Sequence, residues 1–257
     1  MPDDALIQTR DAGPIRELRL SRPPVNALDD ALCAALVNAI DQAVDDGIHG
    51  LVLGGNDGVF SAGLDVPWLM SLGEDRDALT AAWHGFFQAA RALAGSPLPV
   101  VVAIGGHCPA GGCVLSLCCD YRIMAAGPWQ IGLNELQVGL TVPEGIQRLL
   151  RRTVGAYRAE RLLLHGHMVD GVHALDIGLV DERVAPQALW TRSHDWLQAL
   201  LALPRAPMLA TRATARADLV QALSSEHVDL AGNIRDWYQP DTQAALRQLL
   251  QRLGKTV

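Results

Sequence analysis

Apolar and polar positions along the chain follow two different periods. Residues 7–20 alternate between the two kinds around Gly13-Pro14, which predicts a β-hairpin. After Asp29 the apolar positions recur at helical spacing, so we expect a helix that Asp29 caps and that ends at Gly47. The apolar positions of this helix are Leu32, Leu36, Ile40 and Val44.

Short apolar runs then alternate with helical segments through the middle of the chain. The expected strands are residues 50–55, 100–106, 120–125 and 179–184. The expected helices between them are residues 76–93 and 114–119. Strands that alternate with helices in this way are typical of an α/β fold with crossover connections.

The C-terminal part of the chain has a different pattern. After Pro186 the pattern is helical, with helix starts expected near Ser224-Ser225 and Pro240-Asp241. We therefore expect a boundary near residue 195. It would separate a core, residues 1–195, from a helical region, residues 196–257.

Composition and charge restrict the kind of protein. The chain has 257 residues and a formal net charge of −7, which argues against nucleic acid as a main partner. The longest apolar run, residues 98–104, is too short to cross a membrane. The acidic start, residues 1–5, resembles neither a signal peptide nor a transit peptide. We expect a cytoplasmic protein, of bacterial type.

The cysteines favour a structural role. None of them forms a C-x-x-C pair, so the pattern argues against zinc and thioredoxin-like chemistry. We expect buried, reduced thiols. A catalytic thiol at Cys108 or Cys113 is the alternative, although no histidine or asparagine partner pattern accompanies it. The five positions are Cys33, Cys108, Cys113, Cys118 and Cys119.

Three stretches carry candidate chemistry, and each alone is a weak signal. The turns at Phe60–Asp65 and Pro109–Cys113 consist of small residues, follow apolar runs and precede helical patterns. Such turns expose backbone N–H groups, and two of these aimed at one point stabilise a developing oxyanion. In the third stretch, Glu135 lies among apolar residues, which should raise its pKa and suits a general acid or base.

Taken together, the stretches resemble the crotonase family, also called the enoyl-CoA hydratase/isomerase superfamily. Within it they are most similar to the mitochondrial-type Δ3,Δ2-enoyl-CoA isomerases, which share FSAGLD, PAGGC, CDYRI and IGLNE. The resemblance implies a fold of repeated ββα units in two packed sheets. It also implies a C-terminal helical region that packs against the acyl site and helps to build a homotrimer or hexamer; the apolar helices, with Leu249 and Leu253, fit a cap folded back on one subunit equally well. The strings that carry it are RPPVNAL at 22–28, FSAGLD at 60–65, PAGGC at 109–113, CDYRI at 119–123 and ALDIGLVD at 174–181.

The resemblance also implies roles for particular residues. The backbone amides of Leu64 and Gly111 would hold the thioester oxygen of an acyl-CoA, and Glu135 would move the proton. No metal and no cofactor are implied beyond the coenzyme A that the substrate carries. The residues implied in coenzyme A binding are Asn26, Ala27, Leu28, Ala62, Gly63, Leu64, Asp65, Val66 and Gly111.

One departure from the hydratases decides which reaction is expected. Hydratases of this family carry a glutamate on the helix after the glycine-rich turn, where this chain has Val114. Moving a double bond needs one mobile proton, taken from C2 and returned at C4, and one glutamate in a dry pocket suits that task. We therefore expect conversion of a 3-enoyl-CoA to the trans-2-enoyl-CoA, a step in fatty acid β-oxidation.

Two residues leave alternatives open. Glu144, where the isomerases carry an apolar residue, either points to solvent and caps a helix near Gly145, or adds a second acid to the acyl pocket. The second case would favour hydration or thioester hydrolysis. His107 either packs beneath the turn or acts as a base. A non-catalytic scaffold that binds acyl-CoA is a further alternative.

Further residues concern the two ends of the substrate. Aromatic and apolar residues after the first turn either shape an acyl tunnel or belong to the core. Lys255 is the only lysine and lies close to the end of the chain, so arginines are expected to meet the coenzyme A phosphates. The residues in question for the tunnel are Trp68, Leu69, Trp83, Phe86 and Phe87.

Overall fold

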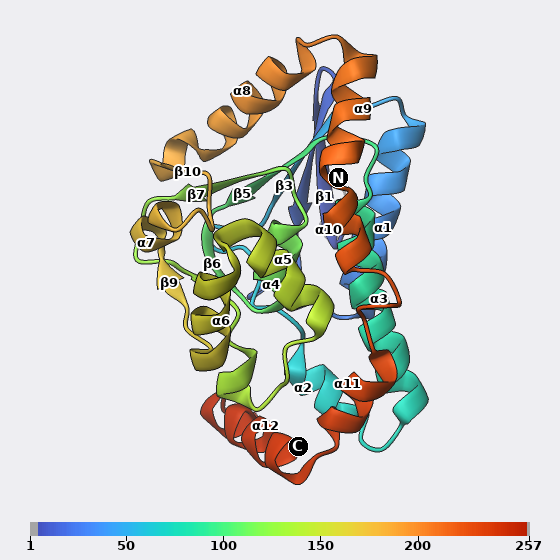
Figure 1. Cartoon of the computed structure of the whole chain (residues 1–257), viewed down its shortest axis with the longest axis vertical. Coiled ribbons are helices and arrows are strands. Elements are labelled where there is room, and N and C mark those ends of the chain that lie inside the picture. Colours follow the sequence, from blue (N-terminus) through green and yellow to red (C-terminus); the bar gives the residue numbers. More distant parts are fainter. Residues whose placement is uncertain (1–4, 256–257) are drawn as a thin grey trace.

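The structure, a computed structural model that describes residues 5–255, contains two β-sheets with helices around them (Figure 1). The larger sheet has six strands in the order β1-β2-β3-β5-β7-β10, and the smaller has four in the order β4-β6-β8-β9. Most of the acidic start of the chain, residues 1–4, lies outside the described residues. The predicted α/β class is confirmed.

The strands are short. The predicted hairpin of residues 7–20 is present, and strands alternate with helices through the middle of the chain as predicted. The strands are β1 (Ile7–Ala12), β2 (Ile15–Leu20), β3 (Gly50–Gly54), β4 (Gly58–Val59), β5 (Val100–Ile104), β6 (Gly106–Pro109), β7 (Tyr121–Ala125), β8 (Gln130–Gly132), β9 (Val169–Asp170) and β10 (Glu182–Val184). The helices are α1 (Asp30–Asp45), α2 (Val66–Ser71), α3 (Arg76–Ala94), α4 (Gly111–Leu117), η1 (Glu135–Val138), α5 (Glu144–Val154), α6 (Ala156–His165), α7 (Gly171–Asp176), η2 (Pro186–Ala188), α8 (Leu189–Leu201), α9 (Arg205–Ala215), α10 (Ala217–Ala222), α11 (Leu230–Trp237) and α12 (Pro240–Arg252).

The same unit is repeated three times. A strand of the larger sheet is followed by a strand of the smaller sheet and then by helix, in β3-β4-α2, β5-β6-α4 and β7-β8-α5. The strand predicted over residues 100–106 is present as β5 but ends two residues early, because the chain leaves the larger sheet at Gly105 and enters the smaller one at Gly106. A Cβ on Gly106 would lie 1.8 Å from the carbonyl carbon of Gly58, so β4 and β6 require glycine there.

The topology of the smaller sheet brings the three candidate stretches together. Strands β4, β6 and β8 are parallel, with Val59 beside His107 and Pro109 beside Gly132. Parallel strands end at the same edge of a sheet, and each of these three is followed at once by one of the stretches. The segments that leave this edge begin at Phe60, Ala110 and Leu133.

The core confirms most of the predicted pattern. Strands β3 and β5 are buried along their whole length, and α1 buries Leu32, Leu36 and Ile40. Val44 differs, being 38% exposed, while Ala43 is buried in its place. Because 3.6 residues make one turn, the buried stripe of this helix reaches position 43 rather than 44 at its end.

The C-terminal helices cover the sheets and one end of the site. Helix α8, which contains residue 195, packs on β3, β5 and β7, and α12 packs on α2 and η1 (Figure 1). The helix predicted to start at Ser224 begins instead at Leu230, because the Asp229 carboxylate caps it through the Gly232 amide. The division into two units near residue 195 stays a prediction.

No helix within residues 5–255 is long and apolar enough to cross a membrane.

Candidate active site

A cavity of about 660 Å³ opens at the edge where β4, β6 and β8 end. Its wall combines the loops at 22–27 and 62–65 with mostly apolar side chains from α2, α3, α4, α5 and α12. The three stretches singled out in the sequence meet there. The predicted residues that line the cavity are Ala27, Ala62, Leu64, Asp65, Val66, Gly111, Val114 and Glu135.

The two small-residue turns touch one another. Gly63 has φ +82°, and a Cβ built on it would lie 3.0 Å from the Gly111 amide nitrogen and 3.0 Å from the Ala110 Cβ. Glycine is therefore required at position 63 both for its backbone conformation and for the approach of the second turn. This contact brings the Leu64 and Gly111 amides to one wall of the cavity.

Both of these amides are free to bind a ligand. Neither the Leu64 nor the Gly111 N–H donates a hydrogen bond to any residue within 5–255. The backbone on either side of Leu64 is fixed, because Leu28 donates to the Gly63 oxygen at 2.8 Å and Asp65 donates to the Leu28 oxygen at 3.0 Å. Gly111 is the first residue of α4, where helical N–H groups lack partners within the helix.

An unusual backbone conformation starts α4. Ala110 has φ 46° and ψ −121°, in the left-handed half of the Ramachandran plot that residues with a Cβ avoid. Such conformations cost about 1–3 kcal/mol and persist where the surrounding structure imposes them, often at functional sites. Here the conformation turns the chain from β6 so that α4 begins with Gly111 at the cavity wall.

Glu135 supplies a carboxyl group to the same cavity. It is the first residue of η1, it is 8% exposed, and its Oε2 has no hydrogen-bond partner among the described residues. Burial raises its pKa from 4.5 to about 7, because a desolvated carboxylate is disfavoured relative to the neutral acid. A group with this pKa can both accept and return a proton near neutral pH.

Asn26, Leu28 and Gly63 lie behind the cavity wall and do not line it. The Asn26 side chain is fully buried, accepts from the Arg22 amide at 2.8 Å and donates to the Phe60 oxygen at 3.0 Å. It therefore holds the 22–27 loop against the first turn. The sequence does not distinguish such a supporting residue from one that contacts a ligand.

The structure places Glu144 and His107 outside the cavity. The Glu144 side chain is 58% exposed and pairs with Arg148 at 2.7 Å, and this arginine lowers its pKa. Of the two interpretations, the structure supports the one in which Glu144 faces solvent at the start of a helix. His107 lies on β6, where its Nδ1 accepts from the Gln130 amide at 3.2 Å and its ring meets that of Trp129 edge to face.

The aromatic and apolar residues considered for an acyl tunnel divide between the cavity wall and other places. Trp83 and Phe86 line the cavity, whereas Trp68, Leu69 and Phe87 do not. Val114 presents an apolar side chain to the cavity, at the position where the family's hydratases carry a glutamate. None of the five cysteines lines it either, and all five are buried thiols whose pKa burial raises.

The end of the chain forms part of the wall, as the resemblance implies for the C-terminal helices, although neither Lys255 nor Arg22 was predicted to line the cavity. Leu249, Leu253 and Lys255 close the cavity from α12 and the residues after it. Arg22 also lines the cavity and is held by Asp65 at 2.8 Å and Asp29 at 2.9 Å. Spacing of apolar residues predicts the helix but contains no signal for what the helix covers.

Comparison with known proteins agrees with this geometry. Human mitochondrial enoyl-CoA delta isomerase 1 is 32% identical over 248 residues, covering 95% of this chain and 82% of that protein. A probable enoyl-CoA hydratase of Mycobacterium avium is 34% identical over 206 residues, covering 80% of this chain and 79% of that protein. The crystal structure of the human mitochondrial delta3-delta2-enoyl-CoA isomerase superposes with a TM-score of 0.91 at 30% identity, covering 97% of this chain and 98% of that one.

The family is also shown by a sequence model of enoyl-CoA hydratases and isomerases, which matches residues 10–243. The predicted crotonase fold and the predicted resemblance are confirmed. The chain belongs to the enoyl-CoA hydratase/isomerase family, the crotonase superfamily.

Proposed function

We propose that this enzyme is a Δ3,Δ2-enoyl-CoA isomerase, which moves the double bond of a 3-enoyl-CoA to the trans-2 position. The observation that carries the proposal is that, among residues 5–255, Glu135 alone has a buried carboxyl oxygen without a partner, and it lies in a cavity whose wall also holds two free amides. The similarity to isomerases at about 30% identity supports the same reaction.

In the proposed mechanism, the thioester oxygen accepts hydrogen bonds from the Leu64 and Gly111 amides. The Glu135 carboxylate removes a proton from C2, and the electrons pass into the thioester as an enolate conjugated with the C3–C4 double bond. The two amides stabilise the negative charge that gathers on the oxygen, and one such donor contributes about 3 kcal/mol to the transition state. Neutral Glu135 then returns the proton at C4, which leaves the double bond between C2 and C3.

The apolar wall favours isomerisation over hydration. Addition of water needs a group that holds and activates water in addition to the group that handles the second proton. Val114 cannot hydrogen-bond water, and Glu144 lies outside the cavity. A dry cavity also protects the enolate from protonation by solvent.

Coenzyme A would enter past Ala27, Ala62 and Val66, which line the cavity with small or apolar groups. The expectation that arginines alone meet its phosphates is revised here. Arg22 is already held by two carboxylates, whereas no ion pair of Lys255 occurs among residues 5–255. We therefore assign a phosphate contact to Lys255, and no metal or further cofactor takes part in the proposed reaction.

We also propose that the protein is a cytoplasmic homotrimer or hexamer. Large apolar side chains on α6 and α7 are exposed in the single chain, which supports burial against a second copy. They are Tyr157 at 69%, Leu164 at 67% and Val172 at 63% exposure.

A paired assay tests the proposed reaction. Purified protein is given 3-hexenoyl-CoA in one cuvette and crotonyl-CoA in the other, and the conjugated 2-enoyl chromophore is followed in both. We expect the chromophore to appear with 3-hexenoyl-CoA and to persist with crotonyl-CoA. Loss of crotonyl-CoA at a comparable rate would establish hydration, the reaction suggested by the Mycobacterium avium relative. No change in either cuvette would favour a scaffold that only binds acyl-CoA.

A further inference from the structure

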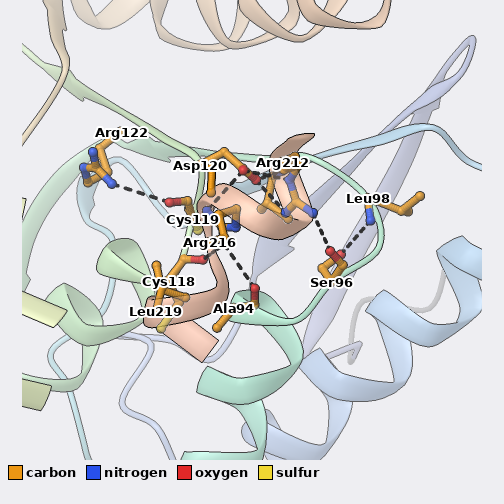
Figure 2. A network of polar contacts seen from close by, with 12 residues as sticks. Ala94, Ser96, Leu98, Cys118, Cys119, Asp120, Arg122, Arg212, Arg216 and Leu219 are labelled. Atoms are coloured by element: carbon orange, nitrogen blue, oxygen red, sulfur yellow. Dashed lines mark hydrogen bonds and ion pairs between the residues drawn. The ribbon is translucent and has the colours of Figure 1, made fainter. Parts of the chain in front are cut away.

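One buried arginine joins the C-terminal helices to α3 and α4, two of the helices that line the cavity. Arg216, between α9 and α10, is 7% exposed. Its Nη2 donates to the Cys118 oxygen at 2.7 Å and to the Ala94 oxygen at 3.3 Å (Figure 2). Its Nη1 pairs with the Asp120 carboxylate at 3.1 Å.

The two carbonyl groups mark the carboxyl ends of two helices. Ala94 is the last residue of α3, and Cys118 is the C-cap residue of α4. Carbonyls at such ends lack partners within the helix, and a positive charge there is favourable to the helix dipole. Arg216 thus satisfies both helix ends with a single guanidinium group.

The same two helices carry much of the site. Helix α3 contributes Trp83 and Phe86 to the cavity, and α4 contributes Gly111 and Val114. Helix α4 has only seven residues, so a change at its carboxyl end is transmitted over less than two turns to the Gly111 amide. The far end of α4 thus lies within two turns of the amide that the proposed mechanism uses.

A second arginine of the same cluster provides a natural comparison. Arg212, on α9, binds Asp120 with two hydrogen bonds of 2.8 Å and donates to the Ser96 oxygen at 2.7 Å (Figure 2). It shares with Arg216 the Asp120 carboxylate and the link between the C-terminal helices and the core, although it is only partly buried. It contacts the carboxyl-terminal carbonyl of neither α3 nor α4.

We infer that Arg216 is a positioning residue, which fixes the carboxyl ends of α3 and α4 and thereby the Gly111 amide and the acyl wall. Arg212 secures the C-terminal helices to the core without acting on the site. This inference rests on the proposed function, because it requires the Gly111 amide to bind the thioester oxygen.

The test compares R216M with R212M, each of which removes one guanidinium from Asp120. Turnover and KM are measured with 3-hexenoyl-CoA at a temperature at which both variants are folded by circular dichroism. The probe of the amide is acetoacetyl-CoA, whose enolate absorbs in the near ultraviolet, so that the apparent pKa of the bound thioester is read from a pH titration. R216K, which keeps the charge but offers fewer donors, completes the series.

We expect R216M to lower kcat by about tenfold with a smaller change in KM, since a displaced donor costs transition-state binding. The enolate of bound acetoacetyl-CoA should then need a higher pH to form. R212M should lower the melting temperature but keep kcat within about twofold of the wild type. For R216K, both kcat and the pH at which the enolate forms should lie between the values of the wild type and R216M.

Equal kcat values and equal enolate titrations for R216M and R212M would overturn the inference. If R216M does not fold, R216K decides, because a wild-type titration with R216K would contradict the role assigned to the two carbonyl contacts. Failure of the wild-type protein to stabilise the enolate would instead contradict the proposed function, and the inference with it.

Discussion

The Thr242 hydroxyl donates a hydrogen bond of 2.8 Å to the carbonyl oxygen of Gly139, which joins α12 to the end of the turn that carries Glu135. The two segments also approach closely, because a Cβ on Gly139 would lie 2.6 Å from the Cβ of Ala245. Gly139 has φ +78°, so its conformation and its neighbour both require glycine. The C-terminal helix therefore supports the candidate base as well as closing the cavity.

We predict that Thr242→Val lowers turnover several-fold with little change in KM. The substitution keeps the shape of the side chain but leaves the Gly139 carbonyl without its partner, so η1 is held less firmly. The lost buried hydrogen bond should also reduce the free energy of unfolding by about 1–2 kcal/mol. Steady-state kinetics and urea unfolding measure the two effects. Thr242→Ser, which retains the hydroxyl, is the control, and equal turnover in both variants would refute the support assigned to α12.

Gly63→Ala should lower kcat/KM by at least about a hundredfold, the usual effect of losing one oxyanion donor. The added Cβ would meet the Gly111 nitrogen at 3.0 Å and force the two amides apart. Gly73→Ala is the matched control, since Gly73 also has positive φ, +60°, but has no atom within 4 Å of the added Cβ. An equal loss of kcat/KM in both alanine variants would show that backbone strain, rather than separation of the amides, causes the loss.

The two small-residue turns of the site could be predicted from sequence because each is a contiguous string that reveals a backbone requirement, and Glu135 could be predicted from its apolar neighbours. Their convergence was expected only from the resemblance, because the short strands β4, β6 and β8 that end at one edge were not predicted from the sequence. The sequence could not, however, distinguish residues that line the cavity from residues that support its wall from behind. Asn26 and Ala27 are neighbours in the chain, yet only Ala27 lines the cavity, because the Asn26 side chain is buried and hydrogen-bonded to the backbone of Arg22 and Phe60.

Glu144→Gln should leave isomerisation within about twofold of the wild type, as is usual for surface substitutions. Its carboxylate pairs with Arg148 at the surface and does not reach the cavity. The measurement is kcat/KM with 3-hexenoyl-CoA, with crotonyl-CoA as a parallel substrate. A loss of tenfold or more with either substrate would mean that Glu144 enters the catalytic site during turnover.

Lys255→Met should raise KM for 3-hexenoyl-CoA by about tenfold while kcat stays unchanged, because the contact with phosphate is the same in the ground and transition states. The control substrate is the corresponding pantetheine thioester, which has no phosphates. Its kinetics should be equal for the wild type and the variant. A fall in kcat with both substrates would place Lys255 at the reacting end of the cavity instead.

The resemblance implies that the C-terminal helices pack against the acyl site, but the spacing of apolar residues alone does not predict which of their side chains reach the cavity. Leu249 and Lys255 reach the cavity only through tertiary contacts with segments more than a hundred residues away. Their sequence neighbourhood resembles that of any amphipathic surface helix. The same limit applies to Arg216, which looks like a helix-surface residue in sequence and is buried between two helix ends in the structure.

The raised pKa of Glu135 predicts a specific pH dependence of stability. In the unfolded chain the carboxyl group ionises near pH 4.5, whereas in the folded protein it keeps its proton until about pH 7. The folded state therefore binds more protons between these values, and stability falls as pH rises through this window. Relative to Glu135→Gln, the wild type should lose about 3 kcal/mol between pH 4.5 and 7 and no more above it. Urea unfolding of both proteins from pH 4 to 8 measures the difference, and parallel curves would show that Glu135 is not desolvated.

The central claim is that one carboxyl group carries the proton, and the rate of 3-hexenoyl-CoA isomerisation by the wild type and by Glu135→Gln tests it most directly. For the wild type, kcat/KM should rise with pH to a plateau, with a midpoint near the pKa of about 7, because the carboxylate is the form that removes the C2 proton. The folded Glu135→Gln variant should be slower by several orders of magnitude at every pH. Turnover by this variant within about tenfold of the wild type would contradict the account.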